Sequence, residues 1–257
     1  MEARELLEIM DKHFSKGFFN CFGENDAHIF RDELDLAFCD NKKTIDFEWK
    51  WDFGVSKFCI IPCHENWVLK IPFNAIYEEC ERTVKLTDED GEEYEDYESF
   101  DEPYPIEGAN SVYEVAKWDY CAAEAAAYDH ATDLGIEKYF AETKFLGYVA
   151  GYPVYIQEKA EIFCDRYSGG SQERQSYTPE ERDEMEAKIG TITSKQEYCP
   201  ELPSTTWMLD FLSCYGEKAL EEFLEGLSQM SVEDLHNGNV GYVNNQPKLI
   251  DYSSWNE

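Results

Sequence analysis

The stretch DLHNGNVGYVNNQPKLID, residues 234–251, carries three side chains suited to phosphate and metal chemistry. Two apolar segments, VGYV and KLI, flank NNQP, and Asn and Pro favour a chain reversal, so the sequence predicts a hairpin. The hairpin returns the chain, which places Asn239 beside Asp251. Two protein oxygens, with other positions left to water and phosphate, are how Mg²⁺ is commonly held. Asp234 lies five residues before Asn239, and we expect it to accept a proton from a phosphate acceptor.

Alternating segments upstream must position this loop. IDFEWKWDF, SKFCIIP and WVLKIPF, within residues 44–73, predict an antiparallel meander. TKFLGYV and YPVYIQEKA predict two more strands, joined by a tight turn at Ala150 and Gly151. Between these groups, a helical pattern begins at Ser111, and further helices are predicted over 2–22, 28–38, 178–190 and 206–230. The fold class is therefore α+β.

The polar stretch resembles the protein kinase-like fold. DLHNGNVG followed by LIDY is similar to the catalytic loop and metal-binding aspartate of that fold, and is nearest to the aminoglycoside and choline phosphotransferase branch. The resemblance implies that Asp234 is the catalytic base and Asn239 the second metal ligand. It gives Asp251 the place of the aspartate that opens the D-F-G triplet.

The resemblance extends upstream. WVLKI is similar to the third-strand V-A-I-K pattern, which implies that Lys70 binds the nucleotide phosphates and that Glu124 is the helix residue that orients it. YIQEKA is similar to the strand that leads into the hinge, so the backbone from Glu158 to Ala160 is implied to meet adenine. ATP and Mg²⁺ are the implied nucleotide and cofactor.

Some positions depart from the family pattern. Val232 stands two residues before Asp234, where histidine is common, and Tyr252 and Ser253 follow Asp251 in place of Phe and Gly. Gly54 is the one glycine of the first strand-turn-strand. The chain ends six residues after Asp251 without A-P-E or the helices that place the acceptor, so we expect a minimal, C-terminally reduced form.

Three regions are expected from these features. Residues 1–43 form an N-terminal helical extension. Residues 44–158 form a kinase-like N-lobe with a five-stranded sheet, helix C and an acidic insertion over 78–107. Residues 159–257 form a reduced C-lobe with the catalytic loop and the metal-binding hairpin. Eleven of the twenty residues from 88 to 107 are acidic, which predicts a solvated insertion or hairpin.

Composition limits the partners. The chain has 55 acidic and 22 basic residues and a net charge of -33, which disfavours direct binding to nucleic acid or anionic membranes. The N-terminus is acidic and amphipathic, and no apolar run reaches the length of a bilayer span, so we expect a cytoplasmic protein. Nine scattered cysteines without a CxxC pair predict reduced, buried thiols.

Three functions compete at this level. The first is an ATP- and Mg²⁺-dependent phosphotransferase that acts on a small-molecule or protein hydroxyl. The second is a nucleotide-binding pseudokinase or scaffold, favoured by the sparse glycine loop and the missing acceptor platform. The third is an acidic decoy that binds a basic protein partner, favoured by the net charge.

Overall fold

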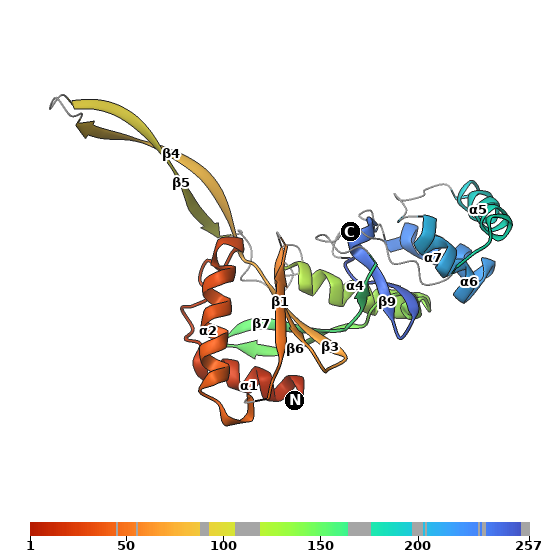
Figure 1. The fold of residues 1–257 in the computed structure, drawn as a ribbon, viewed down its shortest axis with the longest axis horizontal. Helices are drawn as coiled ribbons and strands as arrows, with labels where there is room; N and C mark the ends of the chain where they lie inside the picture. The colour runs from red at the N-terminus through yellow and green to blue at the C-terminus, as the bar shows by residue number, and fades with distance from the viewer. Residues whose placement is uncertain are drawn as a thin grey trace.

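The computed structural model describes residues 1–44, 46–54, 56–87, 93–105, 119–163, 176–196, 203, 205–230, 232 and 235–252. Within these residues the protein is α+β, as predicted, with six α-helices and a five-stranded antiparallel sheet (Figure 1). The elements are arranged around two separate apolar cores, one on each side of the region where the sheet meets helix α4.

The five-stranded sheet has the order β1-β2-β3-β7-β6, and all neighbours are antiparallel. The strands are β1 (Trp49–Phe53), β2 (Lys57–Pro62), β3 (Trp67–Pro72), β6 (Thr143–Val149) and β7 (Tyr152–Glu158). The turn between β6 and β7 contains Ala150 and Gly151, both with positive φ, as the tight-turn prediction requires. The two groups of predicted strands therefore join into one sheet, with β3 at its centre.

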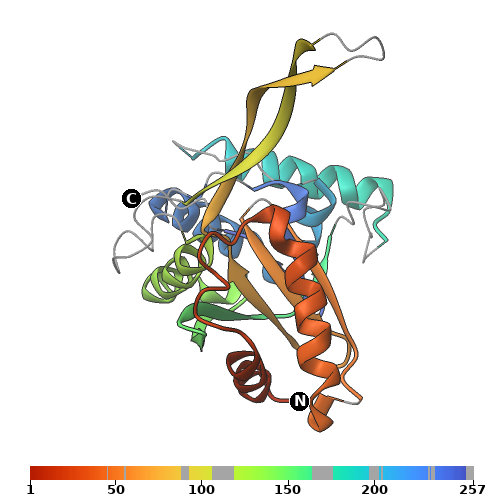
Figure 2. The same cartoon turned by 90° about the vertical axis from the view of Figure 1, so that its left-hand side faces the viewer.

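Helices α1 (Ala3–His13) and α2 (Ala27–Cys39) cover one face of this sheet (Figures 1 and 2). Their apolar residues pack on alternate residues of the strands, including Phe58, Ile60 and Leu69. The helix predicted over 2–22 is shorter, because Phe14 already has extended dihedral angles. The phenylalanines beyond His13 instead form an aromatic cluster around Phe30, and that tertiary burial outweighs continued helical periodicity.

The acidic insertion forms a two-stranded antiparallel ribbon of β4 (Ala75–Thr87) and β5 (Glu93–Pro105). Its register runs from Ala75 opposite Pro105 to Thr87 opposite Glu93. The ribbon extends away from the rest of the protein in both views (Figures 1 and 2). The hairpin interpretation of the insertion is thus confirmed, although β4 already begins at Ala75, before residue 78.

The C-terminal half is mainly helical. It contains α4 (Tyr120–Leu134), α5 (Pro179–Thr193), α6 (Thr205–Tyr215), α7 (Glu217–Met230) and a small sheet of order β10-β9-β8. The strands of this sheet are β8 (Glu161–Ile162), β9 (Val240–Val243) and β10 (Gln246–Leu249). The core of this C-terminal half contains aromatic residues such as Trp207, Phe211 and Phe223. Ala127 and Ala131 of α4 belong to the same core. Helix α4 therefore joins the C-terminal core to the five-stranded sheet.

Two helix predictions need correction. The helix predicted over 206–230 is two helices, because Gly216 takes a left-handed φ of 85° between α6 and α7. Helix α4 begins at Tyr120, since Asp119 has extended dihedral angles and caps it through the N–H groups of Cys121 and Ala122. The predicted helix start at Ser111 lies outside the described residues.

The remaining expectations concern membrane-spanning segments and the cysteines. None of the helices in the described ranges combines the length and apolarity needed to cross a membrane. Cysteine side chains are described at six of the nine positions, and all six are free thiols, as expected. Cys21, Cys39 and Cys214 are exposed, however, which corrects the expectation that the thiols are buried.

Candidate functional site

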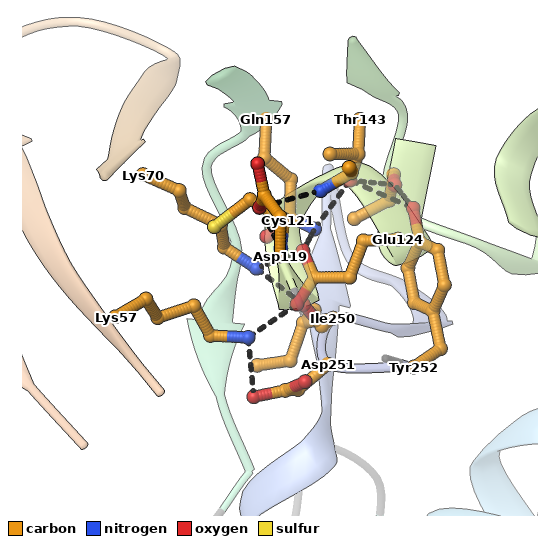
Figure 3. A network of polar contacts seen from close by, with 12 residues as sticks. Lys57, Lys70, Asp119, Cys121, Glu124, Thr143, Gln157, Ile250, Asp251 and Tyr252 are labelled. Atoms are coloured by element: carbon orange, nitrogen blue, oxygen red, sulfur yellow. Dashed lines mark hydrogen bonds and ion pairs between the residues drawn. The ribbon is translucent and has the colours of Figure 1, made fainter. Parts of the chain in front are cut away.

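Four charged side chains meet on the face of the sheet opposite α1 and α2, where α4 and the end of β10 approach it (Figure 3). Lys57 comes from β2, Lys70 from β3, Glu124 from α4, and Asp251 from the segment after β10. Lys70 of β3 lies opposite Cys59 of β2. Lys57 is two residues before Cys59 on the same strand, so Lys57 and Lys70 lie on the same face of the sheet. The antiparallel register therefore brings the two cations together.

Glu124 is the centre of the cluster and is 0% exposed. Its Oε2 lies 2.6 Å from Lys70 Nζ, and its Oε1 accepts a hydrogen bond from Lys57 Nζ. The two lysines are also buried, so this carboxylate compensates two cations that would be costly on their own. Burial raises the pKa of Glu124, and the two ammonium groups counteract that rise. The predicted ion pair of Lys70 and Glu124 is confirmed.

Asp251 joins the cluster through Lys57, whose Nζ lies 2.9 Å from Asp251 Oδ2. Burial acts to raise the pKa of Asp251, but Lys57 and Lys70 outweigh it and hold this pKa well below its usual range. Burial likewise opposes the charge of Lys57, yet Glu124 and Asp251 raise the pKa of its ammonium group. The side chain of Asp251 is 31% exposed, so the cluster reaches solvent at this carboxylate.

The predicted hairpin carries Asp251 to this position. Strands β9 and β10 pair from Val240 opposite Leu249 to Val243 opposite Gln246, and both turn asparagines have positive φ. The carbonyl oxygen of Asn239 accepts hydrogen bonds from the N–H groups of Ile250 (2.8 Å) and Asp251 (3.3 Å). Asn239 and Asp251 are therefore neighbours at the open end of the hairpin, as predicted.

Lys70 is also tied directly to the hairpin, because its Nζ donates to the Ile250 carbonyl oxygen at 3.0 Å. A single ammonium group on β3 thus contacts both helix α4 and the residue before Asp251. This contact fixes the sheet, the helix and the hairpin relative to one another at one point.

A chain of neutral hydrogen bonds extends from Glu124 (Figure 3). Gln157 Nε2 lies 3.5 Å from Glu124 Oε2 and donates to Thr143 Oγ1 at 2.7 Å. Tyr252 donates its hydroxyl hydrogen to the Ala141 carbonyl at 2.5 Å, and so accepts from Thr143 Oγ1 at 2.7 Å. Tyr252 stands where the family pattern has Phe, and its hydroxyl anchors the segment after Asp251.

A second buried carboxylate, that of Asp119, caps the start of α4. Asp119 accepts hydrogen bonds from the N–H groups of Cys121 and Ala122 and from the hydroxyl of Tyr155, each at 2.9 Å. Burial is the main influence on this group and raises the pKa of Asp119 to about 6, although the three hydrogen bonds act in the opposite direction. This network fixes the helix that presents Glu124.

The segment implied to meet adenine connects the two sheets. Glu158 ends β7, and its Oε2 accepts from Lys248 Nζ at 2.6 Å and from the Glu142 N–H at 3.0 Å. Ala160 precedes β8 and lies close to Gly241 of β9. Neither Glu158 nor Ala160 takes part in the cluster of Lys57, Lys70, Glu124 and Asp251. Their implied contact with adenine therefore depends only on their position between the two sheets.

The predicted catalytic base, Asp234, lies outside the described residues. Its described neighbours Val232 and Leu235 are buried in the C-terminal core. After them, His236 Nδ1 accepts a hydrogen bond from the Gly238 N–H at 3.0 Å, which orders the loop before Asn239.

Lys57 is the cluster residue that the sequence interpretation missed. A signal was present in KFCIIP, where Lys57 and Cys59 alternate with the apolar residues Phe58 and Ile60. Alternation places Lys57 on the face of β2 opposite the N-terminal core. The sequence pattern does not show, however, that α4 and the hairpin cover that face.

The donor set at the hairpin suits a hard cation that retains water. Asp251 supplies a carboxylate, and Asn239 is held beside it. Within the described ranges, no group of three or more His, Cys, Asp or Glu residues is arranged to hold a metal ion. Asn239 and Asp251 are thus the two residues at the hairpin that could hold Mg²⁺, with water and phosphate at the remaining positions.

Comparisons with known proteins returned no match among protein-family models, curated proteins or solved structures.

Proposed function

We propose that this chain is a kinase-like phosphotransferase that uses ATP and Mg²⁺ to phosphorylate a hydroxyl. The observation that carries the proposal is the convergence of Lys70, Glu124 and Asp251 from a central strand, a helix and a hairpin far apart in the sequence. A buried lysine held by a helix carboxylate beside a partly exposed aspartate suits polyphosphate with its metal ion. The order of the five strands, a three-stranded meander followed by β7 and β6, also supports the kinase-like fold.

Each residue has a distinct task in this proposal. Lys70 binds nucleotide phosphate oxygens, and Glu124 orients Lys70 through the 2.6 Å ion pair. Asn239 and Asp251 hold Mg²⁺, which neutralises charge on the phosphates. Asp234 takes the proton of the acceptor hydroxyl as its oxygen bonds to the γ-phosphorus and the bond to ADP breaks.

Thermal unfolding with and without nucleotide tests this function. Mg-ATP at on the order of 100 times its dissociation constant stabilises a protein that binds it by about 2.7 kcal/mol. Lys70→Met should remove most of this stabilisation. Lys144→Met is the matched control, because Lys144 is an exposed lysine of the same sheet that pairs with Glu142. Asp234→Asn should retain the stabilisation and lose transfer of labelled phosphate to any hydroxyl acceptor.

A second function is favoured by the ion pair of Lys57 and Asp251. This contact compensates the aspartate without a metal ion, which suits a pseudokinase that binds nucleotide and does not transfer phosphate. Mg-ATP stabilisation of the wild type without transfer to small-molecule or protein acceptors would favour this alternative. Absence of stabilisation by any nucleotide and metal would overturn both functions.

The projecting ribbon of β4 and β5 favours a third function, the binding of a basic protein partner. Removal of residues 78–102 should then abolish salt-sensitive capture of basic proteins and leave Mg-ATP stabilisation unchanged. Equal capture by the full and the shortened chain would exclude the ribbon as the binding element.

A further inference from the structure

Lys57 is the member of the charged cluster to which the proposed function gives no task. It lies near the start of β2, three residues after Gly54, and its carbonyl oxygen accepts from the Gly54 N–H at 3.2 Å. Lys57 therefore follows the turn between β1 and β2 directly, and its side chain lies on the face that carries Lys70.

The four charges balance as the structure stands. Two ammonium groups face two carboxylates, and both lysines contact Glu124. In addition, Lys57 contacts Asp251, and Lys70 contacts the Ile250 carbonyl oxygen. A divalent cation at Asp251 would add positive charge close to the Lys57 ammonium group, which lies 2.9 Å from Asp251 Oδ2. Like charges at such a separation repel strongly in a buried site, so one of them must find another anionic partner.

The phosphates of a nucleotide provide that partner. Lys70 cannot take the place of Lys57 at Asp251 while it bonds Glu124 and the Ile250 carbonyl. Lys57, by contrast, bridges two carboxylates, and one of them, Glu124, retains Lys70 when Lys57 moves. A shift of Lys57 from Asp251 to a phosphate oxygen therefore leaves no carboxylate of the cluster without a cation.

We infer that Lys57 is a second phosphate-binding lysine, which occupies Asp251 until a nucleotide with its metal ion binds and then bonds the nucleotide phosphates. This inference rests on the proposed nucleotide site and adds a residue and an exchange of ion pairs to it. Its consequence is that metal alone competes poorly for Asp251, because the ion must displace a bonded ammonium group without supplying a phosphate.

Covalent labelling of the wild type tests this placement without a mutation. An acyl-phosphate derivative of ATP transfers its acyl group to a lysine amine beside the phosphates, and the nucleotide phosphate leaves as the amide bond forms. Mass spectrometry should find both Lys57 and Lys70 acylated, with both reactions suppressed by excess ATP and with the exposed Lys144 unprotected. Labelling of Lys70 without Lys57 would overturn the inference, whereas labelling of neither would overturn the proposed nucleotide site as well.

Binding by variants tests the exchange itself. Lys57→Met should raise the dissociation constant of Mg-ATP by about tenfold or more, since it removes a charged hydrogen bond, and should leave the dissociation constant of adenosine unchanged. Lys57→Arg keeps the charge and should fold if the methionine variant does not, with a smaller loss of affinity. Mn²⁺ alone should stabilise Lys57→Met more than the wild type, because the ion then does not have to displace the Lys57 ammonium group from Asp251.

The outcomes are distinguishable. Equal Mg-ATP affinity of the wild type and Lys57→Met would show that Lys57 is a structural counter-ion and would refute the inference, while the nucleotide site would stand. An equal loss of adenosine and Mg-ATP affinity would also refute it, because a phosphate contact affects only the phosphorylated ligand. A wild type that binds neither ligand would refute the site together with the inference.

Discussion

The hydroxyl of Tyr252 gives the most direct test of how the site is held together. The side chain is 0% exposed, and the hydroxyl bonds Ala141 O at 2.5 Å and Thr143 Oγ1 at 2.7 Å. Tyr252→Phe removes both bonds and keeps the ring, which packs edge-on against Phe140 at a centroid distance of 5.2 Å. The change therefore isolates the hydrogen bonds from the apolar packing.

The magnitude follows from the contacts that remain. Thr143 Oγ1 lies 3.3 Å from Ala141 O and replaces one of the two lost bonds with a longer one. The net loss is about one hydrogen bond with imperfect compensation, which corresponds to about 1 to 2 kcal/mol. In a chain of this size the corresponding fall in melting temperature is about 2 to 8 °C.

Tyr139→Phe is the matched control. Tyr139 is also 0% exposed, and within the described residues its hydroxyl oxygen has no hydrogen-bond partner. Removal of an unpaired buried hydroxyl costs nothing and relieves desolvation, so this variant should be as stable as the wild type or more stable by about 1 kcal/mol. The two substitutions delete the same atom from equally buried rings.

Urea denaturation gives the free energies of unfolding, and a double-mutant cycle with Thr143→Val gives the coupling between the two hydroxyls. We expect a coupling of about 0.5 to 1.5 kcal/mol. Equal effects of Tyr252→Phe and Tyr139→Phe, or a coupling near zero, would contradict the role assigned to the chain of hydrogen bonds between Glu124 and the segment after Asp251.

Three further predictions concern other elements. Asp119 has a folded-state pKa of about 6 against an ordinary value of 3.8, so the free energy of unfolding of the wild type relative to Asp119→Asn should rise by about 2 kcal/mol as the pH falls from 7 to 4. A difference that is constant with pH in paired urea titrations would contradict this. Gly216→Ala should lower the free energy of unfolding by about 1 kcal/mol, because φ is 85° at this position. Gly190→Ala should raise the free energy of unfolding by about 0.5 to 1 kcal/mol, because Gly190 lies within helix α5 with open space around it. Calorimetry should distinguish the two signs. In the native state, iodoacetamide should modify exposed Cys39 rapidly and buried Cys121 slowly, as followed by mass spectrometry. The reason is that burial raises the pKa of the Cys121 thiol well above its ordinary value. Equal rates of modification would disprove the burial of Cys121.

Local patterns in the sequence determined several elements of this protein. Alternation of apolar residues identified the five strands, and the Asn and Pro of NNQP identified the hairpin that places Asn239 beside Asp251. The segment predicted to be helical over 178–190 forms helix α5, where the structure shows a capping box of Thr178 and Glu181. These features are readable because the responsible interactions lie within a few residues of each other.

Long-range contacts decided the remainder. Helix α1 ends at His13 because Phe14 packs on Phe30 of another helix, and local periodicity carries no information about that partner. Tertiary burial outweighed the local helical periodicity there. The division at Gly216 is instead a local effect of its left-handed φ of 85°, and the two helices it separates both contribute to the C-terminal core.

The same distinction applies to the site. A resemblance to a known sequence pattern selected Lys70, Glu124 and Asp251, and the structure confirms the ion pair of Lys70 and Glu124. Lys57 was not selected, because its importance comes from the register of β2 on β3 and from Asp251, which lies 194 residues away in the chain (251 minus 57). The sequence by itself determined which charged residue types were available. The packing of sheet, helix and hairpin decided which of these charges lie together in one buried site, because charge compensation depends on distance in space and not on separation along the chain.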